Sequence, residues 1–331
     1  MTQICLMPGD GIGPEMIAHA ERVLRALSSE ISFTYADIGF SAYEKHGTPL
    51  PMETLEKIRI ASASLFCAVT TPPNIPNYFS PVVRMRQELQ LFANLRPIRS
   101  ISHPSSRPEI DILIFRENTE GLYSGSERIE DDGNRAITER VITRLGAERI
   151  IRRAFETAKE QNRSTVHVIH KANVLRETDG LFRTVALAVA SEFPEVAMRE
   201  MLVDTCAMEL IHAPEQFEVI VTTNLFGDIL SDEASMLVGG LGVAASGNIG
   251  VDTAVFEPVH GSAPNLVGTG QANPLATFFA VVMMLEHLDE KALSEVLRNA
   301  LMNTISANRV TPDLGGSYTT EQVVTEILKD L

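Results

Sequence analysis

The chain alternates between two patterns of apolar and polar positions. Short apolar runs rich in β-branched residues indicate strands, and these runs are QICLMP, SLFCAVTT, DILIFRE, TVHVIH, AMREMLVD and FEVIVTT. Longer segments with apolar residues at helical spacing lie at residues 14–28, 81–91, 145–160, 175–192 and 225–237, with more near 274–306. Strand followed by helix recurs, which predicts an α/β fold with a parallel or mixed sheet and with ligands at the carboxyl ends of its strands.

Two stretches interrupt this order. SISHPSSRPE, residues 100–109, is typical of a crossing loop, and GGLGVAASGNIG, residues 239–250, is typical of a Gly-rich return. The 331 residues, of which 44% are hydrophobic, also exceed the usual size of one domain. We therefore expect a discontinuous large domain, 1–97 and 239–331, and a small domain, 98–238.

Composition narrows the function. A formal net charge of −15 speaks against binding to nucleic acid or to an anionic membrane, because phosphate groups need clustered Lys and Arg. Cys5, Cys67 and Cys206 are too few and too scattered for a disulfide framework or a zinc site, which indicates a reducing compartment. No apolar run reaches the roughly 20 residues of a membrane span, and the N-terminus lacks a signal-peptide pattern, so we expect a cytoplasmic protein.

A glycine-rich stretch, PGDGIGPE at residues 8–15, follows a predicted strand and opens a predicted helix. It fails the dinucleotide fingerprint G-x-G-x-x-G, because Pro14 occupies the place of the last glycine. Asp37 stands about where a ribose-binding acid would, but without the fingerprint this position carries no weight. We therefore expect a tight turn with Pro14 at the helix start, and a cofactor held in some way other than a Rossmann site.

Two acids stand one helical turn apart in NLFGDILSD. Asp228 and Asp232 place their Cβ atoms about 5–6 Å apart on one helix face, where they repel each other unless a divalent cation binds between them. Asp204, expected at the end of a strand, is a third candidate ligand. Hard oxygen ligands suit Mg²⁺ or Mn²⁺ rather than zinc. By itself, such a pair is more often a solvated helix face.

Arginines are the further residues that such acids need to form a ligand site. Arg84 and Arg86 are two positions apart on a probable helix, so they face different directions and one of them at most can serve a common pocket. Arg86, Arg96 and Arg116 could converge if the helix and two strands meet, and guanidinium forks bind carboxylates bidentately. Three separate surface ion pairs are the alternative.

VHVIHKANVLRETDG places Lys171 just after a strand. A lysine beside acids and a metal can accept a proton if its pKa is lowered, and a tyrosine can donate one. Tyr123 follows Arg116 by seven residues. His170 is given a structural role only.

Eight motifs in chain order resemble those of one family: GDGIGPE, LFANLRP, FRENTEGLYSG, HKANVL, TTNLFGDILSDEAS, FEPVHGSAP, ANP and TPDLGG. They span residues 9–316. The chain resembles the β-decarboxylating dehydrogenases, which act on isocitrate, homoisocitrate, 3-isopropylmalate, tartrate or D-malate. The resemblance implies their two-lobed fold with a mixed sheet, in which the large domain binds the cofactor and the small domain carries substrate, metal and dimer-interface elements.

The resemblance also implies a mechanism. Mg²⁺ or Mn²⁺ would be held by Asp204, Asp228 and Asp232. The substrate carboxylates would be clamped by Arg86, Arg96 and Arg116. Lys171 would accept the hydroxyl proton as hydride leaves C2 for the nicotinamide, and Tyr123 would protonate the carbon after carbon dioxide departs. In this family the site is shared across a two-fold dimer, so Lys171 and Asp204 would come from the partner chain of a homodimer or tetramer.

Cofactor contacts follow from the same resemblance. The adenosine side would meet Glu257, His260, Gly261, Ser262 and Ala263. The adenine would lie near Asn273 and Asp313, and the nicotinamide near Asn173. NAD users of this family carry Asp where this chain has Asn265, whereas NADP users carry Lys and Tyr at Asn265 and Leu266. Asn can still bind ribose hydroxyls but does not repel a 2′-phosphate, so we expect NAD with weaker discrimination than usual.

The substrate is ranked from NYFSPVVRMR. Isopropylmalate enzymes tend to place an acid and leucines there, and Phe79, Val82 and Val83 do not match the acid. Ser80 matches a serine that isocitrate enzymes use on the distal carboxylate. The pattern SPVVxxR resembles fungal homoisocitrate dehydrogenases, although some bacterial ones carry Arg at the position of Val83. Homoisocitrate therefore ranks first, then isocitrate, with both accepted as an option, and isopropylmalate third. Silent regulatory subunits of the family lose the metal or proton-transfer residues, which this chain keeps, so we expect an enzyme.

Overall fold

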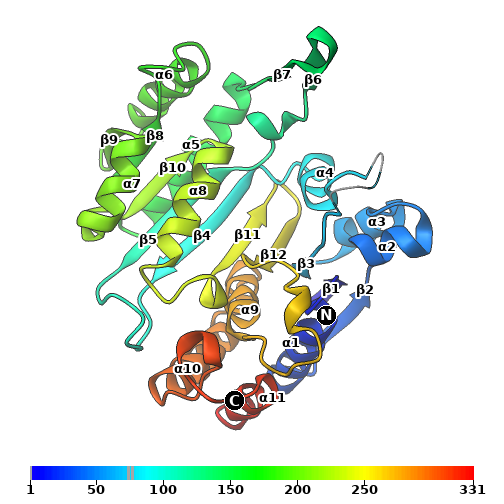
Figure 1. Cartoon of the computed structure of the whole chain (residues 1–331). Helices are drawn as coiled ribbons and strands as arrows, with labels where there is room; N and C mark the ends of the chain where they lie inside the picture. Colours follow the sequence, from blue (N-terminus) through cyan, green and yellow to red (C-terminus); the bar gives the residue numbers. More distant parts are fainter. Residues whose placement is uncertain (1, 73–74, 76–77) are drawn as a thin grey trace. The chain divides into compact units, whose positions relative to one another are not determined.

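The structure is a computed structural model that describes residues 2–72, 75 and 78–331, and it falls into two compact units (Figure 1). The first unit comprises Met1–Leu89, Ser100–Pro108 and Ser235–Leu331, and the second comprises Gln90–Arg99 and Glu109–Ala234. The chain therefore crosses between units at other points than the predicted boundaries. Residues 90–97 belong to the second unit rather than to the large domain, because Ala93–Arg99 is a strand that pairs within the sheet of the second unit. Asn77, the first residue of the stretch used to rank substrates, lies outside the described residues.

The first unit is a mixed sheet with strand order β2-β1-β3-β12-β11, in which β11 alone runs antiparallel to its neighbour. Its strands are β1 (Thr2–Gly9), β2 (Ile31–Tyr35), β3 (Ala63–Ala68), β11 (Ala245–Ile249) and β12 (Ala254–Pro258). Its helices are α1 (Gly13–Leu27), α2 (Phe40–His46), α3 (Met52–Ile60), α4 (Pro81–Glu88), α9 (Leu275–His287), α10 (Lys291–Ser306) and α11 (Thr320–Lys329), with short 3₁₀ turns η4 (Leu241–Val243), η5 (Pro264–Leu266) and η6 (Pro312–Leu314).

Helices α1 and α9 pack side by side against the strands of the first unit, with α10 and α11 packed outside them (Figure 1). The central strands are buried along almost their whole length, as expected for parallel strands covered on both faces. Leu6 and Leu65 on the strands share one hydrophobic core with Met16 of α1 and Phe278 of α9. This core fixes the sheet on which the predicted cofactor residues stand.

The second unit is also a mixed sheet, with order β4-β5-β10-β8-β9, in which only β4 is antiparallel to its neighbour. Its strands are β4 (Ala93–Arg99), β5 (Asp111–Glu117), β8 (Thr165–His170), β9 (Ala197–Leu202) and β10 (Val219–Thr222), and a separate hairpin pairs β6 (Glu127–Glu130) with β7 (Arg135–Thr138). Its helices are α5 (Arg144–Glu160), α6 (Thr178–Ala190), α7 (Val203–His212) and α8 (Asn224–Ser235), with 3₁₀ turns η1 (Leu122–Ser124), η2 (Asp131–Gly133) and η3 (Pro214–Gln216).

Parallel pairing brings the carboxyl ends of β5, β8 and β10 to one edge of the second unit's sheet. Arg116 stands near the end of β5, Lys171 directly follows β8, and α8 begins just after β10. Helix α5 packs across these three strands, and the hydroxyl of Thr143 caps its start by accepting the N–H of Gly146. The edge of the sheet where ligands are expected therefore carries Arg116, Lys171 and the start of the helix that holds Asp228 and Asp232.

Most strongly patterned segments were predicted correctly, and two were not. Asp204 does not end a strand, because β9 stops at Leu202 and the chain turns at once into α7, whose first turn holds Asp204. The stretch 239–250 is not simply a return, because it contains β11. Among the residues that the structure describes, no helix is both long and apolar enough to cross a membrane.

Candidate active site

Two acids and two arginines meet in the second unit. Arg96 donates from Nη1 to Asp232 Oδ1 at 2.9 Å and from Nη2 to Asp228 Oδ1 at 3.2 Å. Arg116 also donates to Asp228 Oδ1. Both guanidinium groups are buried, whereas the carboxylates are partly open to solvent. From the sequence, Arg86, Arg96 and Arg116 could converge or could form separate surface ion pairs. Arg96 and Arg116 do lie together on Asp228, so for these two the alternative of separate surface ion pairs is wrong.

The charges of this cluster balance without any ligand. Two guanidinium groups offset two carboxylates, which relieves the repulsion that the acids would otherwise exert across one helical turn. A divalent cation at the acids would therefore release the two guanidinium forks toward a polyanion. Hard oxygen donors at this spacing fit Mg²⁺ or Mn²⁺.

Tyr123, on η1, completes the cluster. Its hydroxyl donates to Asp228 Oδ2 at 2.9 Å, and the guanidinium carbon of Arg116 lies 5.4 Å from the centre of its ring. The phenol therefore holds its proton at the edge of the acid pair, on the opposite carboxylate oxygen from the arginines. This position suits a proton donor to a ligand bound there.

Residues that the sequence did not single out shape this cluster. Asn224 accepts from Nε and Nη2 of Arg116 at 3.0 and 2.8 Å, and so fixes the plane of that guanidinium group. Gly227 lets β5 approach α8, because a Cβ there would lie 2.7 Å from the Cβ of Arg116. Ser231 accepts from Arg96 Nη1 at 2.6 Å. The sequence did contain a signal for them, because polar and small residues occur on a helix that is otherwise apolar.

Lys171 and Asp204 form a second charged pair in the second unit. The ammonium group of Lys171 donates to Asp204 Oδ1, and this contact lowers the pKa of Asp204 below its ordinary value. Asp204 thus pairs with Lys171 within its own chain. In the described part of the chain, no three His, Cys, Asp or Glu side chains are placed to hold a metal ion together.

In the first unit, Arg86 of α4 points inward and Arg84 points to solvent, as their spacing predicted. Arg86 Nη2 donates to Glu257 Oε1 at 2.9 Å, and Asn248 Nδ2 donates to the same oxygen at 2.7 Å. Nε of Arg86 is buried and finds no acceptor among the described residues. Glu257 therefore neutralises Arg86, which is a role that its predicted place on the adenosine side did not suggest.

The remaining substrate candidates lie beside Arg86 on α4. The Ser80 hydroxyl caps the helix by accepting the N–H of Val83 at 3.4 Å. Because the hydroxyl only accepts in this contact, its own O–H is not used by the cap. Val83 is half-buried and offers no charge, so any contact it makes is apolar.

The predicted cofactor loop follows β12 in the first unit. Ser262 O accepts the N–H of Ile12 at 3.0 Å, and its hydroxyl lies 2.8 Å from that of Thr70. Ala263 takes the left-handed conformation at φ 40°, which bends the chain into η5. Gly11 is required beneath it, because a Cβ there would lie 2.0 Å from Ser262 O.

The other predicted dinucleotide contacts lie on this loop and elsewhere in the chain. Burial lowers the pKa of His260, so its ring is neutral at pH 7, and its buried Nε2 has no partner in the part of the chain that the structure describes. Gly261 has open space where a side chain would stand. Asn273 Nδ2 donates to Asp313 Oδ2 at 2.9 Å. Asn265, within η5, and Asn173, after β8, are both exposed.

The GDGIGPE motif has a structural explanation. Asp10 accepts the N–H groups of Phe40, Ser41 and Thr70, each at 2.8 Å. One buried carboxylate thus ties the glycine turn to α2 and to the segment that meets Ser262. The motif therefore holds the turn before α1 next to the predicted cofactor loop.

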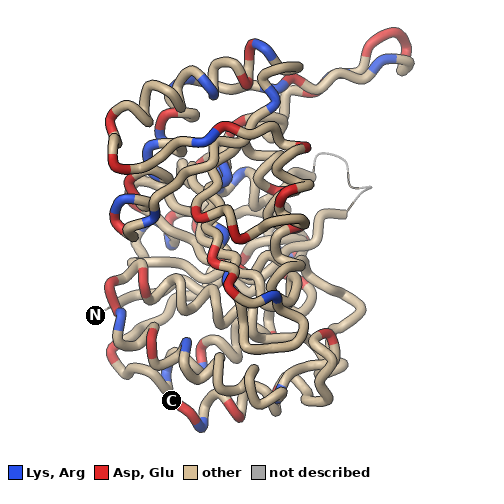
Figure 2. Tube along the Cα trace, turned by 90° about the vertical axis from the view of Figure 1, so that its left-hand side faces the viewer, with Lys and Arg blue, Asp and Glu red and all other residues tan. Residues whose placement is uncertain are grey.

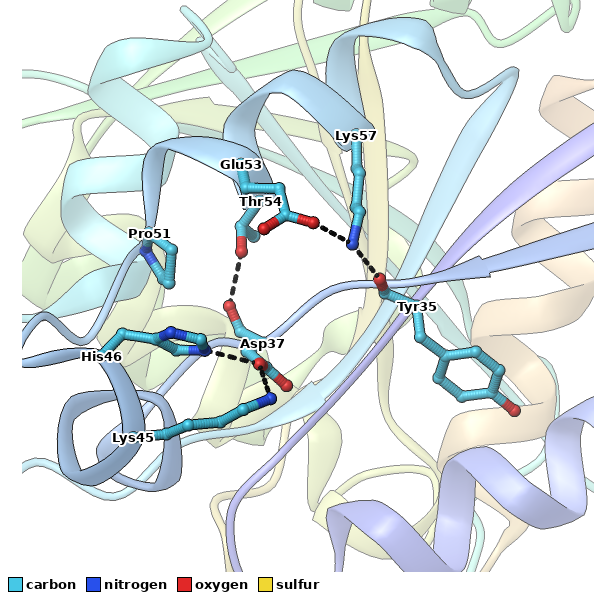
Figure 3. Close-up of a pocket in the computed structure, with 8 residues that line it drawn as sticks. All are labelled: Tyr35, Asp37, Lys45, His46, Pro51, Glu53, Thr54 and Lys57. Atoms are coloured by element: carbon cyan, nitrogen blue, oxygen red, sulfur yellow. Dashed lines mark hydrogen bonds and ion pairs between the residues drawn. The ribbon is translucent and has the colours of Figure 1, made fainter.

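Asp37 lines a pocket of about 270 Å³ in the first unit (Figure 3). Its Oδ2 lies 2.7 Å from both Lys45 Nζ and His46 Nε2, and these contacts lower the pKa of Asp37. Lys57 pairs with Glu53 across the same pocket. The charged groups of this pocket pair with one another. Asp37 is already paired with Lys45 and His46, whereas binding a ribose hydroxyl would need a free carboxylate.

Acidic and basic positions are interspersed along the trace in the view of Figure 2 rather than separated by sign. With a net charge of −15, an anionic ligand needs a local group of basic side chains. Arg96 and Arg116 form such a group in the second unit.

Known proteins share this sequence and fold. The model of a family described as isocitrate/isopropylmalate dehydrogenase matches residues 3–329. An isocitrate/homoisocitrate dehydrogenase of Thermus thermophilus is 49% identical over 333 residues, which cover 99% of each chain. A 3-isopropylmalate dehydrogenase of Methanothermobacter thermautotrophicus is 45% identical over 330 residues, which cover 99% of this chain and 98% of the relative. The crystal structure of isocitrate dehydrogenase from Methylococcus capsulatus superposes with a TM-score of 0.96 at 42% identity, covering 100% of this chain and 99% of that one.

These findings define a dehydrogenase that acts on a hydroxy acid. The chain belongs to the isocitrate/isopropylmalate dehydrogenase family, the β-decarboxylating dehydrogenases, as its eight motifs indicated. Members of this family generally use a divalent metal and NAD(P). The predicted fold class is confirmed.

Proposed function

We propose that the protein catalyses the metal-dependent, NAD-linked oxidative decarboxylation of a 2-hydroxy acid with a carboxylate on C3. The observation that carries this proposal is the neutral cluster of Arg96, Arg116, Asp228 and Asp232. It offers two cation ligands and two carboxylate forks in one place, which is what a metal-bound polycarboxylate needs.

The chain's own residues have separate tasks in this proposal. Asp228 and Asp232 bind Mg²⁺ or Mn²⁺, and Arg96 and Arg116 orient the substrate carboxylates. Tyr123 keeps a proton at its hydroxyl, 2.9 Å from Asp228, for delivery to carbon. The bound metal would draw electron density from the substrate oxygens and so favour loss of carbon dioxide, and the nicotinamide would take the hydride. The roles of Ser80, Val83 and Arg86, in the first unit, stay predictions.

Lys171 is the proposed proton acceptor, and with Asp204 it would serve the site of a partner chain. Lys171→Met should abolish hydride transfer, and retention of more than about a tenth of the rate would remove Lys171 from this role. Sharing can be tested by mixing Lys171→Met and Asp228→Asn chains after partial unfolding, and by assaying at a Mg²⁺ concentration too low for the Asp228→Asn variant to turn over. A mixed dimer then contains one intact site and one doubly altered site, so about a quarter of the normal activity should return. If mixed dimers form and no activity returns, Lys171 and Asp228 of one chain belong to the same site.

Homoisocitrate is the proposed preferred substrate, with isocitrate close behind or also accepted and isopropylmalate third. The pattern SPVVxxR supports this order, and so does the 49% identity to an isocitrate/homoisocitrate dehydrogenase. The exposed Asn265 supports NAD with modest discrimination against NADP. The test is kcat/KM for all three acids with both cofactors and Mg²⁺. A value for isopropylmalate at least tenfold above both tricarboxylates would overturn the order, and equal or better use of NADP would overturn the cofactor assignment.

A further inference from the structure

A fully buried carboxylate holds the backbone of Lys171. Asp179 lies in the first turn of α6, with 0% of its surface exposed. Its Oδ2 accepts the backbone N–H of Lys171 at 2.6 Å, and its Oδ1 accepts from Arg140. Neither the family motifs nor the cluster described above assigns a role to Asp179 or Arg140.

Arg140 connects this carboxylate to the helix of the acids. Its Nη1 donates to Thr178 Oγ1 at 2.7 Å and its Nη2 to Thr223 Oγ1 at 3.0 Å. Its guanidinium carbon also lies 5.2 Å from the ring centre of Phe226. Thr223 directly precedes α8, and Phe226 stands in its first turn. One guanidinium group thus bridges the start of α6 and the start of α8.

Other side chains also hold the loop between β8 and α6: the Lys171 ammonium group pairs with Asp204, and His170 Nδ1 accepts the N–H of Ala172 at 3.2 Å. The loop's own turns are closed by Val174 and Leu175, whose N–H groups return to Lys171 O. Asn173 and Val174 are exposed. The carboxylate of Asp179 is the contact that fixes the N–H side of Lys171 where the strand ends. A buried, fully paired ion pair is rigid, because moving either partner leaves an uncompensated charge in a low-dielectric interior.

We propose that Asp179, held by Arg140, is a positioning residue that sets the place of Lys171 and couples it to helix α8. The inference rests on the proposed role of Lys171 as proton acceptor. Small displacements of a reacting group have large kinetic effects, so loss of the anchor should lower kcat about tenfold or more and leave KM within about threefold.

The first test is Asp179→Asn, which keeps the shape and removes the charge. Amide exchange of the segment 170–177 should accelerate at least about tenfold as kcat falls. The matched control is Glu218→Gln at the opposite end of β8, where Glu218 accepts the N–H of Thr165 at 3.0 Å. The control should speed exchange near Thr165 and leave kcat unchanged. Normal kcat and unchanged exchange around Lys171 in folded Asp179→Asn protein would overturn the proposal.

A second variant is available if Asp179→Asn does not fold. Thr223→Val removes one acceptor of Arg140 and should give a smaller change of the same kind, and no change in exchange around Lys171 would count against the proposal. The double variant Asp179→Asn, Lys171→Met should be no slower than Lys171→Met alone. A further multiplied loss would indicate a general structural effect and overturn positioning. High activity of Lys171→Met by itself would instead refute the base assignment.

Discussion

His167 should make the stability of this enzyme fall sharply in mild acid. It lies within β8 with 1% of its surface exposed, and its ring packs edge-on against Phe217 at 4.7 Å between centroids. Neither ring nitrogen has a hydrogen-bond partner among the described residues. Burial, assisted by the nearby charge of Arg199, lowers the pKa of His167 to about 4.

The direction of the effect follows from proton binding. In the unfolded chain a histidine has a pKa of about 6.5, so between that pH and about 4 the unfolded chain holds a proton that the folded chain lacks. The free energy of unfolding therefore decreases as pH falls through this window. The two pKa values correspond to a loss of about 2 kcal/mol at pH 5 and about 3 kcal/mol below pH 4.

His167→Phe isolates the contribution of His167 protonation to the free energy of unfolding, because phenylalanine keeps a ring and cannot titrate. The variant should gain about 2 kcal/mol relative to the original protein when pH is lowered from 7.5 to 5. Urea unfolding followed by far-ultraviolet circular dichroism measures it, since the chain has no tryptophan to report by fluorescence. Val168→Ala, at the next buried position, is the control and should cost the same at both pH values. Parallel pH curves for His167→Phe and the original protein, within about 0.5 kcal/mol, would refute the reasoning.

Three further predictions concern the site and the cofactor loop. Asp228→Asn should raise the Mg²⁺ concentration for half-maximal rate at least about tenfold with little change in the urea midpoint, because a ligand charge is lost and the shape remains; an unchanged Mg²⁺ requirement contradicts the assignment. Asp10→Asn should cost about 2 kcal/mol in urea unfolding, because an amide N–H₂ would face N–H donors of Phe40, Ser41 and Thr70; a normal midpoint would show that the turn does not depend on this carboxylate. Asn265→Asp should raise the NAD to NADP ratio of kcat/KM about tenfold by repelling a 2′-phosphate, and an unchanged ratio would separate Asn265 from the ribose.

Much of the fold could be predicted because local pattern and tertiary role agree in it. DILIFRE and TVHVIH are apolar on both faces, as strands between helices must be, and both form where expected. β11 was missed because ASGNI has a glycine and few large apolar residues, and it is a strand only through antiparallel pairing with β12. Such pairing is a property of the folded sheet rather than of the segment.

The residues of the cluster in the second unit were named from the sequence, but their contacts with one another were not. Residue type and spacing pointed to Asp228, Asp232 and the arginines, because charged groups on buried elements need partners. The sequence could not show that Arg96 and Arg116 would bind the acids themselves, since this depends on how β4 and β5 stand beside α8. The same holds for Glu257, whose partner lies 171 residues away in the sequence.

The order in which the chain visits its two units affects how the protein is made. The ribosome releases every residue of the second unit once Ala234 has emerged, whereas the first unit still lacks the strands and helices of Ser235–Leu331. Until then β3 has no β12 beside it and α1 has no α9. The second unit can therefore fold first during synthesis, and the residues before Gln90 must wait, with apolar surface uncovered, for the last part of the chain to arrive.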